Sequence, residues 1–279
     1  MYRYKHVAPI VKWAGGKRQL LPEIKPLLPR RIPLYCEPFF GGGAVFFSRQ
    51  PRRAVINDLN SDLMEMYRVV RDNPHELIES LKQHENSPEY FYRLRNLDRD
   101  REAFSALSPV QKASRLIYLN KTCFNGLFRV NASGEFNTPY GRYKNPNIIN
   151  KRVLCSVSRY LNHADIALSS EDFESVLSRL PKGAFVYLDP PYDPVSDTAN
   201  FTGYQGGGFS RAEQIRLKNC CDDLNRRGIR FLLSNSATPF ILELYQSYDI
   251  TIVEAARAIN SVGLGRGAVR EVLVKNYGI

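Results

Sequence analysis

The sequence predicts an α/β fold with a sheet of parallel strands, interrupted by a mostly helical insertion. Seven short β-like runs alternate with helical patterns along the 279-residue chain, and such alternation is typical of parallel α/β sheets. The runs lie at residues 34–39, 54–59, 165–170, 185–191, 229–235, 249–257 and 269–277. Residues 61–153 break the alternation, because they carry almost no strand signal. We therefore expect one discontinuous domain of residues 1–60 and 154–279, and an inserted domain of residues 61–153.

Capping signals mark helices between the strands. Ser210 and Glu213 have the spacing of a capping box, and Gly228 supplies the stop expected at the end of that helix. Thr238 followed by Pro239 predicts the start of another helix. These signals support the assignment of helices between strands of one sheet.

The insertion predicts helices and a hairpin. Helical patterns cover residues 61–72 and 74–84, and a third helix opens at Ser108. Farther along, LFRVN and EFNTPY flank a turn sequence at residues 132–134, which is typical of a β-hairpin.

The overall charge favours a polyanionic partner. The formal net charge is +11 and the isoelectric point is about 9.5. No apolar run reaches the length of a membrane span, and the N-terminus lacks the apolar core of a signal peptide. Five cysteines without a CxxC pair indicate a reducing compartment, and four scattered histidines form no metal-ligand pattern. We expect a cytoplasmic protein without membrane contact and without metal.

The positive charge is concentrated in one part of the insertion. Residues 120–152 contain six Lys and Arg side chains and one acid, Glu135, with aromatic residues interleaved. A basic, aromatic segment with a hairpin is typical of a DNA-contacting element, although a solvated basic face would look similar.

A rigid acidic corner follows the strand at residues 185–191. Asp189 precedes Pro190 and Pro191, which lack backbone donors and hold the chain extended, and Tyr192 comes next. The Asp189 carboxylate and the Pro190 carbonyl are two acceptors that suit an exocyclic amine, and the Tyr192 ring suits a planar base. A base in a duplex would have to be flipped out to reach them.

A glycine-rich loop follows the first strand. Gly41, Gly42 and Gly43 permit a tight turn and close approach of a ligand to the backbone. Asp58 ends the next strand, 17 residues after Gly41, where an acid suits ribose hydroxyls. A tight strand-to-helix turn without a ligand remains an alternative. The Gly-Gly-Lys that ends at Lys17 is not a P-loop, because the required motif is absent.

Together these motifs resemble a known family. KWAGGKRQLL, EPFFGGGAVFF, INDLNSDL, FNGLFRVN, GEFNTPYGRYKNP, DPPY and LSNS occur along nearly the whole chain. This set is similar to that of the Dam-type (alpha-group, D12 class) DNA N6-adenine methyltransferases. The resemblance implies a Rossmann-like catalytic domain at residues 1–60 and 154–279, and a target-recognition domain at residues 61–153.

The resemblance also implies the chemistry. The catalytic residues would be Asp189, Pro190, Pro191 and Tyr192, which accept the two N6 hydrogens of a flipped adenine and stack on its ring. The cofactor would be S-adenosyl-L-methionine, bound by Trp13, Lys17, Phe39, Gly41, Gly43, Asp58, Asp172 and Asp189. Phe173 would help to frame the cofactor's adenine or serve as a core aromatic residue.

For double-stranded DNA the resemblance points to the hairpin, and to GATC as the site. The DNA-binding residues would be Phe124, Asn125, Arg129, Asn131, Pro139, Arg142 and Lys144. Arg129 would read guanine, Phe124 and Asn125 would wedge into the duplex, and Arg142 and Lys144 would hold phosphates. Residues 196–210 are expected to form a lid, and the loop at 258–267 could touch phosphates.

Other functions remain open at this stage. One is methylation of RNA or of a protein glutamine, although glutamine enzymes usually carry NPPY in place of DPPY. Another is a DNA-binding module with a vestigial catalytic corner. We expect a monomer, and a companion restriction endonuclease is possible from the sequence.

Overall fold

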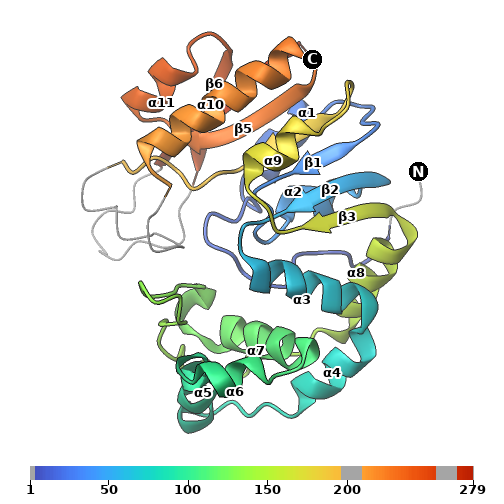
Figure 1. Ribbon diagram of the computed structural model, residues 1–279, viewed down its shortest axis with the longest axis vertical. Coiled ribbons are helices and arrows are strands. Elements are labelled where there is room, and N and C mark those ends of the chain that lie inside the picture. Colours follow the sequence, from blue (N-terminus) through green and yellow to red (C-terminus); the bar gives the residue numbers. More distant parts are fainter. Residues whose placement is uncertain (1–3, 196–208, 256–268, 279) are drawn as a thin grey trace.

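A seven-stranded sheet forms the centre of the computed structural model, which describes residues 4–195, 209–255 and 269–278 (Figure 1). Its strand order is β3-β2-β1-β4-β5-β7-β6. The strands are β1 (Tyr35–Glu37), β2 (Arg53–Asn57), β3 (Asp165–Ser169), β4 (Phe185–Leu188), β5 (Arg230–Ser236), β6 (Asp249–Ala255) and β7 (Val269–Lys275). All seven predicted strands and the α/β fold class are confirmed.

One strand departs from the predicted parallel arrangement. β1 to β5 pair in parallel, whereas β7 runs antiparallel to both β5 and β6. β6 and β7 are neighbours both in sequence and in the sheet, and Ala255 pairs with Val269. Parallel neighbours need a crossover of a dozen or more residues, usually with a helix, so a direct return reverses the strand.

The central strand β4 is buried on both sides. Its four residues have no exposed surface, as expected for a strand inside a parallel sheet. Because successive side chains point to opposite faces, Phe185 and Tyr187 join one hydrophobic cluster and Val186 and Leu188 join the other.

Helices cover both faces. The first cluster includes residues from α1 (Leu21–Leu27), α2 (Ala44–Arg49), α3 (Ser61–Asp72) and α8 (Lys151–His163). The second includes residues from α9 (Phe173–Ser178), α10 (Arg211–Arg226) and α11 (Pro239–Leu244).

The remaining helices extend away from the sheet. They are α4 (Pro74–Lys82), α5 (Pro88–Arg95), α6 (Arg101–Ser105) and α7 (Pro109–Thr122), with 3₁₀ turns η1 (Asn96–Arg99) and η2 (Phe124–Gly126). Figure 1 shows α4 to α7 below the sheet and α3 between them and β3. Residues 61–153 supply no strand to the seven-stranded sheet. The domain boundaries themselves stay a prediction.

Capping explains where the predicted helices begin. Ser108 caps α7 in a complete capping box, and Thr238 caps α11. At the start of α10, the Ser210 side chain accepts from the amide of Glu213 at 3.3 Å, which is half of the predicted capping box. The Glu213 carboxylate instead accepts from Arg216 at 2.7 Å. The sequence interpretation did not specify α5, α6, α8 and α9.

In the part of the chain that the structure describes, none of the helices combines the length and the apolarity needed to cross a membrane. Residues 196–208 of the expected lid and the loop at 258–267, which was expected to contact phosphates, lie outside the described residues.

We predict that His84 makes the folded chain sensitive to acid. Its ring nitrogens lie 2.7 Å from the Tyr90 hydroxyl and 2.8 Å from Ser114 Oγ, and burial lowers the pKa of His84 from 6.5 to about 4. As pH falls from about 6.5 to about 4, the unfolded chain binds a proton that the folded chain does not, so the free energy of unfolding decreases. Urea unfolding at pH 7 and pH 4.5 measures this loss.

The loss should be smaller in His84→Gln than in the wild type. His75→Gln is the control, because His75 is exposed on α4, and it should keep the wild-type loss. An equal loss in His84→Gln and the wild type would contradict the prediction.

Candidate active site

The DPPY corner lies where the strand order of the sheet reverses direction. β4 pairs with β1 on one side and β5 on the other, and ligands of open α/β sheets bind beyond the carboxyl ends of strands at such a switch point. Asp189 directly follows β4, and Glu37 ends β1. The two acids therefore lie beside each other at the crevice.

Asp189 has a cation and a hydroxyl as partners. Its Oδ1 lies 2.6 Å from Lys17 Nζ and accepts from Ser234 Oγ at 3.0 Å. Lys17 is 5% exposed, and its Nζ also lies 4.6 Å from the centre of the Tyr192 ring. A base that stacks on Tyr192 and donates to this oxygen would therefore have to take the place of the Lys17 ammonium.

Burial raises the pKa of both carboxyl groups. It raises the pKa of Asp189, while Lys17 and Ser234 oppose the rise. Burial raises the pKa of Glu37 well above its usual range, although the Tyr35 hydroxyl donates to Glu37 Oε2 at 2.6 Å. The contacts of Lys17 and Ser234 favour the charged form of Asp189, and burial favours the neutral form of both carboxyl groups.

The corner is fixed from behind by buried amides. Gln214 Nε2 donates to the Pro191 carbonyl at 2.9 Å, and Asn235 Nδ2 donates to Gln214 Oε1 at 3.1 Å. Asn235 Oδ1 accepts from the amide of Asp193 at 3.1 Å. Gln214 and Asn235 have no exposed surface. Because the two amide side chains that make these bonds are fully buried, the hydrogen bond to the Pro191 carbonyl restrains the backbone of the corner.

Tyr192 is held by its hydroxyl. The group donates to Glu271 Oε2 at 2.8 Å, and Glu271 on β7 is 6% exposed. This bond fixes the ring while leaving a face toward Lys17.

The glycine loop makes the predicted tight turn. Gly41 and Gly43 have φ of 48° and 64°, in the left-handed region. The amide of Gly41 donates to Asp58 Oδ2 at 2.8 Å, and that of Asn60 donates to Asp58 Oδ1 at 2.9 Å. Asp58 thus ties the loop to the end of β2, and burial raises its pKa.

Trp13 approaches this loop closely. A Cβ on Gly41 would lie 2.7 Å from Trp13 Cδ1. The Trp13 ring also stacks on Phe128 from the insertion, with ring centres 4.9 Å apart.

Aromatic rings line the other side of the glycine loop. Phe39 lies 5.3 Å from Phe173, which is 5% exposed and belongs to the second hydrophobic cluster. Asp172 caps α9 by accepting from the amide of Glu174 at 2.9 Å, and it pairs with Arg216 on α10. Phe173 is therefore a core aromatic residue, which is one of the two roles that the sequence left open.

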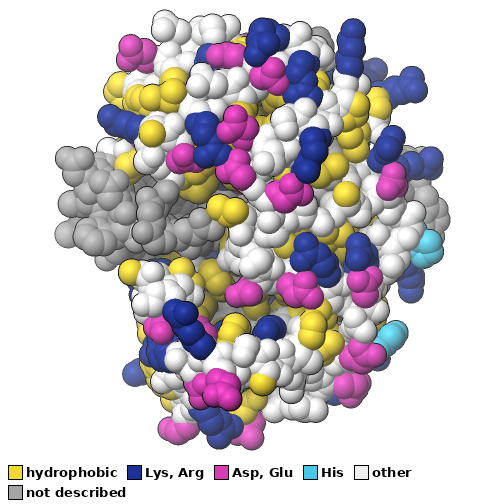
Figure 2. All heavy atoms as spheres, viewed as in Figure 1, with side chains coloured by type: hydrophobic (Ala, Val, Ile, Leu, Met, Phe, Trp, Pro, Cys, Tyr) yellow, Lys and Arg dark blue, Asp and Glu magenta, His cyan; other side chains and the backbone are white. Residues whose placement is uncertain are grey.

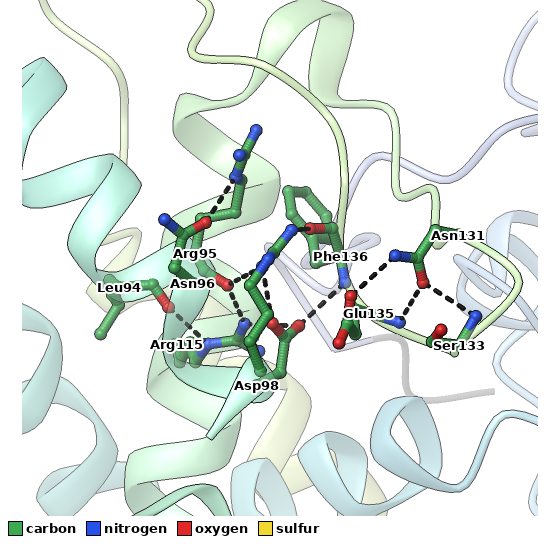
Figure 3. Close-up of polar contacts among 10 residues, drawn as sticks. Leu94, Arg95, Asn96, Asp98, Arg115, Asn131, Ser133, Glu135 and Phe136 are labelled. Carbon is green, nitrogen blue, oxygen red and sulfur yellow. Dashed lines mark hydrogen bonds and ion pairs between the residues drawn. The ribbon is translucent and has the colours of Figure 1, made fainter. Parts of the chain in front are cut away.

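The insertion contains the predicted hairpin, in a short form. Val130 and Phe136 form an antiparallel bridge, and the amide of Asn131 donates to the Glu135 carbonyl at 2.9 Å. Asn131 Oδ1 accepts from the amides of Ser133 and Glu135, so this side chain shapes the turn (Figure 3).

Asp98 anchors the hairpin to the helices. Its Oδ2 accepts from the amide of Phe136 at 2.8 Å and lies 2.8 Å from Arg115 Nη2 on α7 (Figure 3). The hairpin is therefore attached to α7 through a nearly buried ion pair.

Most residues predicted to contact DNA are accessible. Phe124 is 55% exposed, and Arg129, Pro139, Arg142 and Lys144 are exposed as well. Arg129 Nε donates to Asn137 Oδ1 at 2.7 Å, and the Pro139 carbonyl accepts from the amide of Phe124 at 2.8 Å. Asn125 and Arg142 have positive φ, 57° and 54°.

Arg142 and Lys144 also line a hollow. Its volume is about 540 Å³, and Asn86, Tyr92, Tyr140 and Tyr143 contribute to its walls. The charge distribution on the face visible in Figure 2 does not single out a binding surface, because Lys and Arg side chains are spread over it and mixed with acidic ones.

A comparison with models of protein families identifies the family of this chain. Residues 13–259 match the model of the D12 class N6 adenine-specific DNA methyltransferases. The chain belongs to this family. Its members methylate adenine in DNA, so DNA is the substrate and the reaction requires a methyl donor. The resemblance noted from the motifs is confirmed.

The names of three curated relatives are consistent with this family. A Lactococcus lactis subsp. cremoris protein named Type II methyltransferase M1.LlaDCHI is 46% identical over 98% of this chain and 96% of its own. The Methanocaldococcus jannaschii Type II methyltransferase M.MjaIII is 40% identical over 97% and 99%. The DNA adenine methylase of Escherichia coli K12 is 35% identical over 94% and 93%.

The described residues contain no group of three or more His, Cys, Asp or Glu side chains that could hold a metal ion. The sequence interpretation missed Gln214 and Glu271 as supports of the site. Ser234 and Asn235 lie in the LSNS motif, which was the available signal for them.

We predict that Gly41→Ala destabilises the chain more than Gly134→Ala. Both glycines have positive φ, which costs an alanine about 1 kcal/mol. At Gly41 the added Cβ would also clash with Trp13, so we expect a total loss of about 3 kcal/mol. At Gly134 nothing lies within 4 Å of the added atom. Urea unfolding of both variants measures the difference, and equal losses would contradict the tight contact.

Proposed function

We propose that the chain transfers a methyl group from S-adenosyl-L-methionine to N6 of a flipped adenine in double-stranded DNA, at GATC sites. The observation that carries the proposal is the Asp189 carboxylate, an acceptor that Lys17 and Ser234 contact directly and that shares the Lys17 ammonium with the face of the Tyr192 ring. Family membership supports adenine and DNA, and the hairpin motifs support GATC.

The residues around the glycine loop fit this cofactor. S-Adenosylmethionine supplies a methyl group already activated on a sulfonium. Gly41 and Gly43 allow Trp13 and Phe40 to pack tightly against the loop, because a Cβ at either position would clash with these rings. We assign cofactor binding to Trp13, Lys17, Phe39, Gly41, Gly43, Asp58, Asp172 and Asp189. Lys17 suits the cofactor's carboxylate once it leaves Asp189.

Asp189 and the Pro190 carbonyl would accept the two N6 hydrogens. These bonds draw the nitrogen lone pair out of conjugation with the ring and stabilise the positive charge that develops on N6. Tyr192, fixed by Glu271, would stack on the base and keep N6 aligned for transfer. Pro191 has no amide donor to compete for these acceptors, and Gln214 holds its carbonyl.

The hairpin and η2 would recognise the target. Arg129 is exposed and suits bidentate contact with guanine, worth about 1–3 kcal/mol of discrimination. Phe124 and Asn125 would wedge into the duplex, since Phe124 is an exposed ring beside a strained backbone. Asn131 and Pro139 would support the turn and η2, because their contacts are internal. Arg142 and Lys144 would bind phosphates.

The organisation of the chain is part of the proposal. Residues 1–60 and 154–279 would form the catalytic domain and residues 61–153 the target-recognition domain. We propose a monomer. A companion restriction endonuclease is consistent with the names of two relatives, which are type II methyltransferases.

Methyl transfer from labelled S-adenosylmethionine to two duplexes tests the proposal. The duplexes are identical except that one carries GATC and the other GTAC, and both are measured at one salt concentration because non-specific affinity depends steeply on salt. We expect label on adenine N6 of the GATC duplex alone, because the hairpin would position only that adenine.

Label on both duplexes would contradict the GATC assignment and leave the chemistry intact. No label on either duplex, with cofactor binding intact, would contradict the proposed substrate and favour RNA or a protein.

A further inference from the structure

The last turn of α7 joins the insertion to the N-terminal stretch beside the glycine loop. Asn120 lies there and is 1% exposed. Its Nδ2 donates to the carbonyl of Lys12 at 2.7 Å and to that of Gly126 at 3.1 Å, and its Oδ1 accepts from the amide of Lys12 at 2.8 Å. The side chain therefore pairs with both polar groups of the Lys12 backbone, as a neighbouring strand would, and also holds η2.

The residue after Lys12 carries this contact to the glycine loop. Trp13 stacks on Phe128 with an angle of 21° between the rings, and it leaves no room for a Cβ on Gly41. The amide of Gly41 in turn binds Asp58. Because these contacts are tight, a displacement of Lys12 and Trp13 must move the loop as well.

The proposed recognition elements are fixed to the same helix. The amide of Gly141 donates to the carbonyl of Thr122 at 2.8 Å, beyond the hairpin. Arg115, in the middle of α7, holds the hairpin through Asp98 (Figure 3). Hairpin, η2 and α7 thus form one framework, and Asn120 links it by hydrogen bonds to the segment that carries Trp13.

We propose that Asn120 is a positioning residue that couples target recognition to methyl transfer. A correct base contact at the hairpin sets the position of α7, and Asn120 transmits that position through Lys12 and Trp13 to the glycine loop. The proposal rests on the function proposed above. It makes Asn120 a determinant of specificity through its hydrogen bonds to Lys12 and Gly126.

Asn120→Asp is the direct test. The aspartate keeps the acceptor for the Lys12 amide but replaces the donor with an oxygen that faces two carbonyls. The readout is kcat/KM on the sequence that the wild type prefers in a randomised duplex pool, and on the same duplex with one base pair changed. We expect the ratio of the two values to fall about tenfold, as for residues that carry coupling between sites. The cofactor Kd without DNA should stay close to that of the wild type.

A merely structural role would lower both values by the same factor, and an unchanged ratio would overturn the proposal. Phe128→Leu is the second variant, in case Asn120→Asp fails to fold. It removes the ring stacked on Trp13 and should also lower the ratio. Ser158→Ala is the matched control, because Ser158 is 6% exposed and donates to the Arg71 carbonyl, outside this link. It should leave the ratio unchanged.

Trp13 is the only tryptophan in the sequence, so its fluorescence reports on the link. Duplex binding should change the fluorescence of the wild type, and the change should be smaller in Asn120→Asp. Equal changes would overturn the coupling. Failure of the proposed function is distinguishable, because it would appear in the wild type as a preference for another sequence, or as duplex binding without methyl transfer.

Discussion

A charged carboxylate at the end of a fully buried strand is the constraint on which the site depends. Burial at the end of β4 disfavours the charge on Asp189, and the Lys17 ammonium and the Ser234 hydroxyl offset that cost. Beside it, burial raises the pKa of Glu37 well above its usual range, which favours the neutral form of that group. The order of the strands places β4 between β1 and β5, so the ends of these three strands lie together around Asp189.

The groups around Asp189 are held rigidly on one side, whereas on the other side lies Lys17, which a ligand would displace. Buried amides of Gln214 and Asn235 hold the backbone of the corner, and Glu271 holds Tyr192. Lys17, in contrast, occupies the position that an exocyclic amine would take. A site built in this way holds its acceptors in a fixed orientation, which the proposed methyl transfer requires.

The sequence patterns predicted those structural features that depend on residues close together in the chain. The seven strands, the cap of Ser108 and the turn at Gly41 follow from residues close together in sequence. The reversal of β7 and the partners of Glu271, Gln214 and Asn120 do not, because each depends on elements brought together by the topology. Glu213 shows the same limit, since a salt bridge to Arg216 replaces its expected capping contact.

The most direct test of the central role of Asp189 is the single-turnover rate of methyl transfer as a function of pH. Asp189→Asn is compared with the wild type, and Asp72→Asn, on the surface of α3, is the control. In the proposed reaction the charged form of Asp189 accepts from N6, and burial raises the pKa of Asp189, so the wild-type rate should fall on the acid side at a pH above 3.8. Asp189→Asn should be about 100-fold slower at neutral pH. A rate for Asp189→Asn close to that of the wild type would contradict the account.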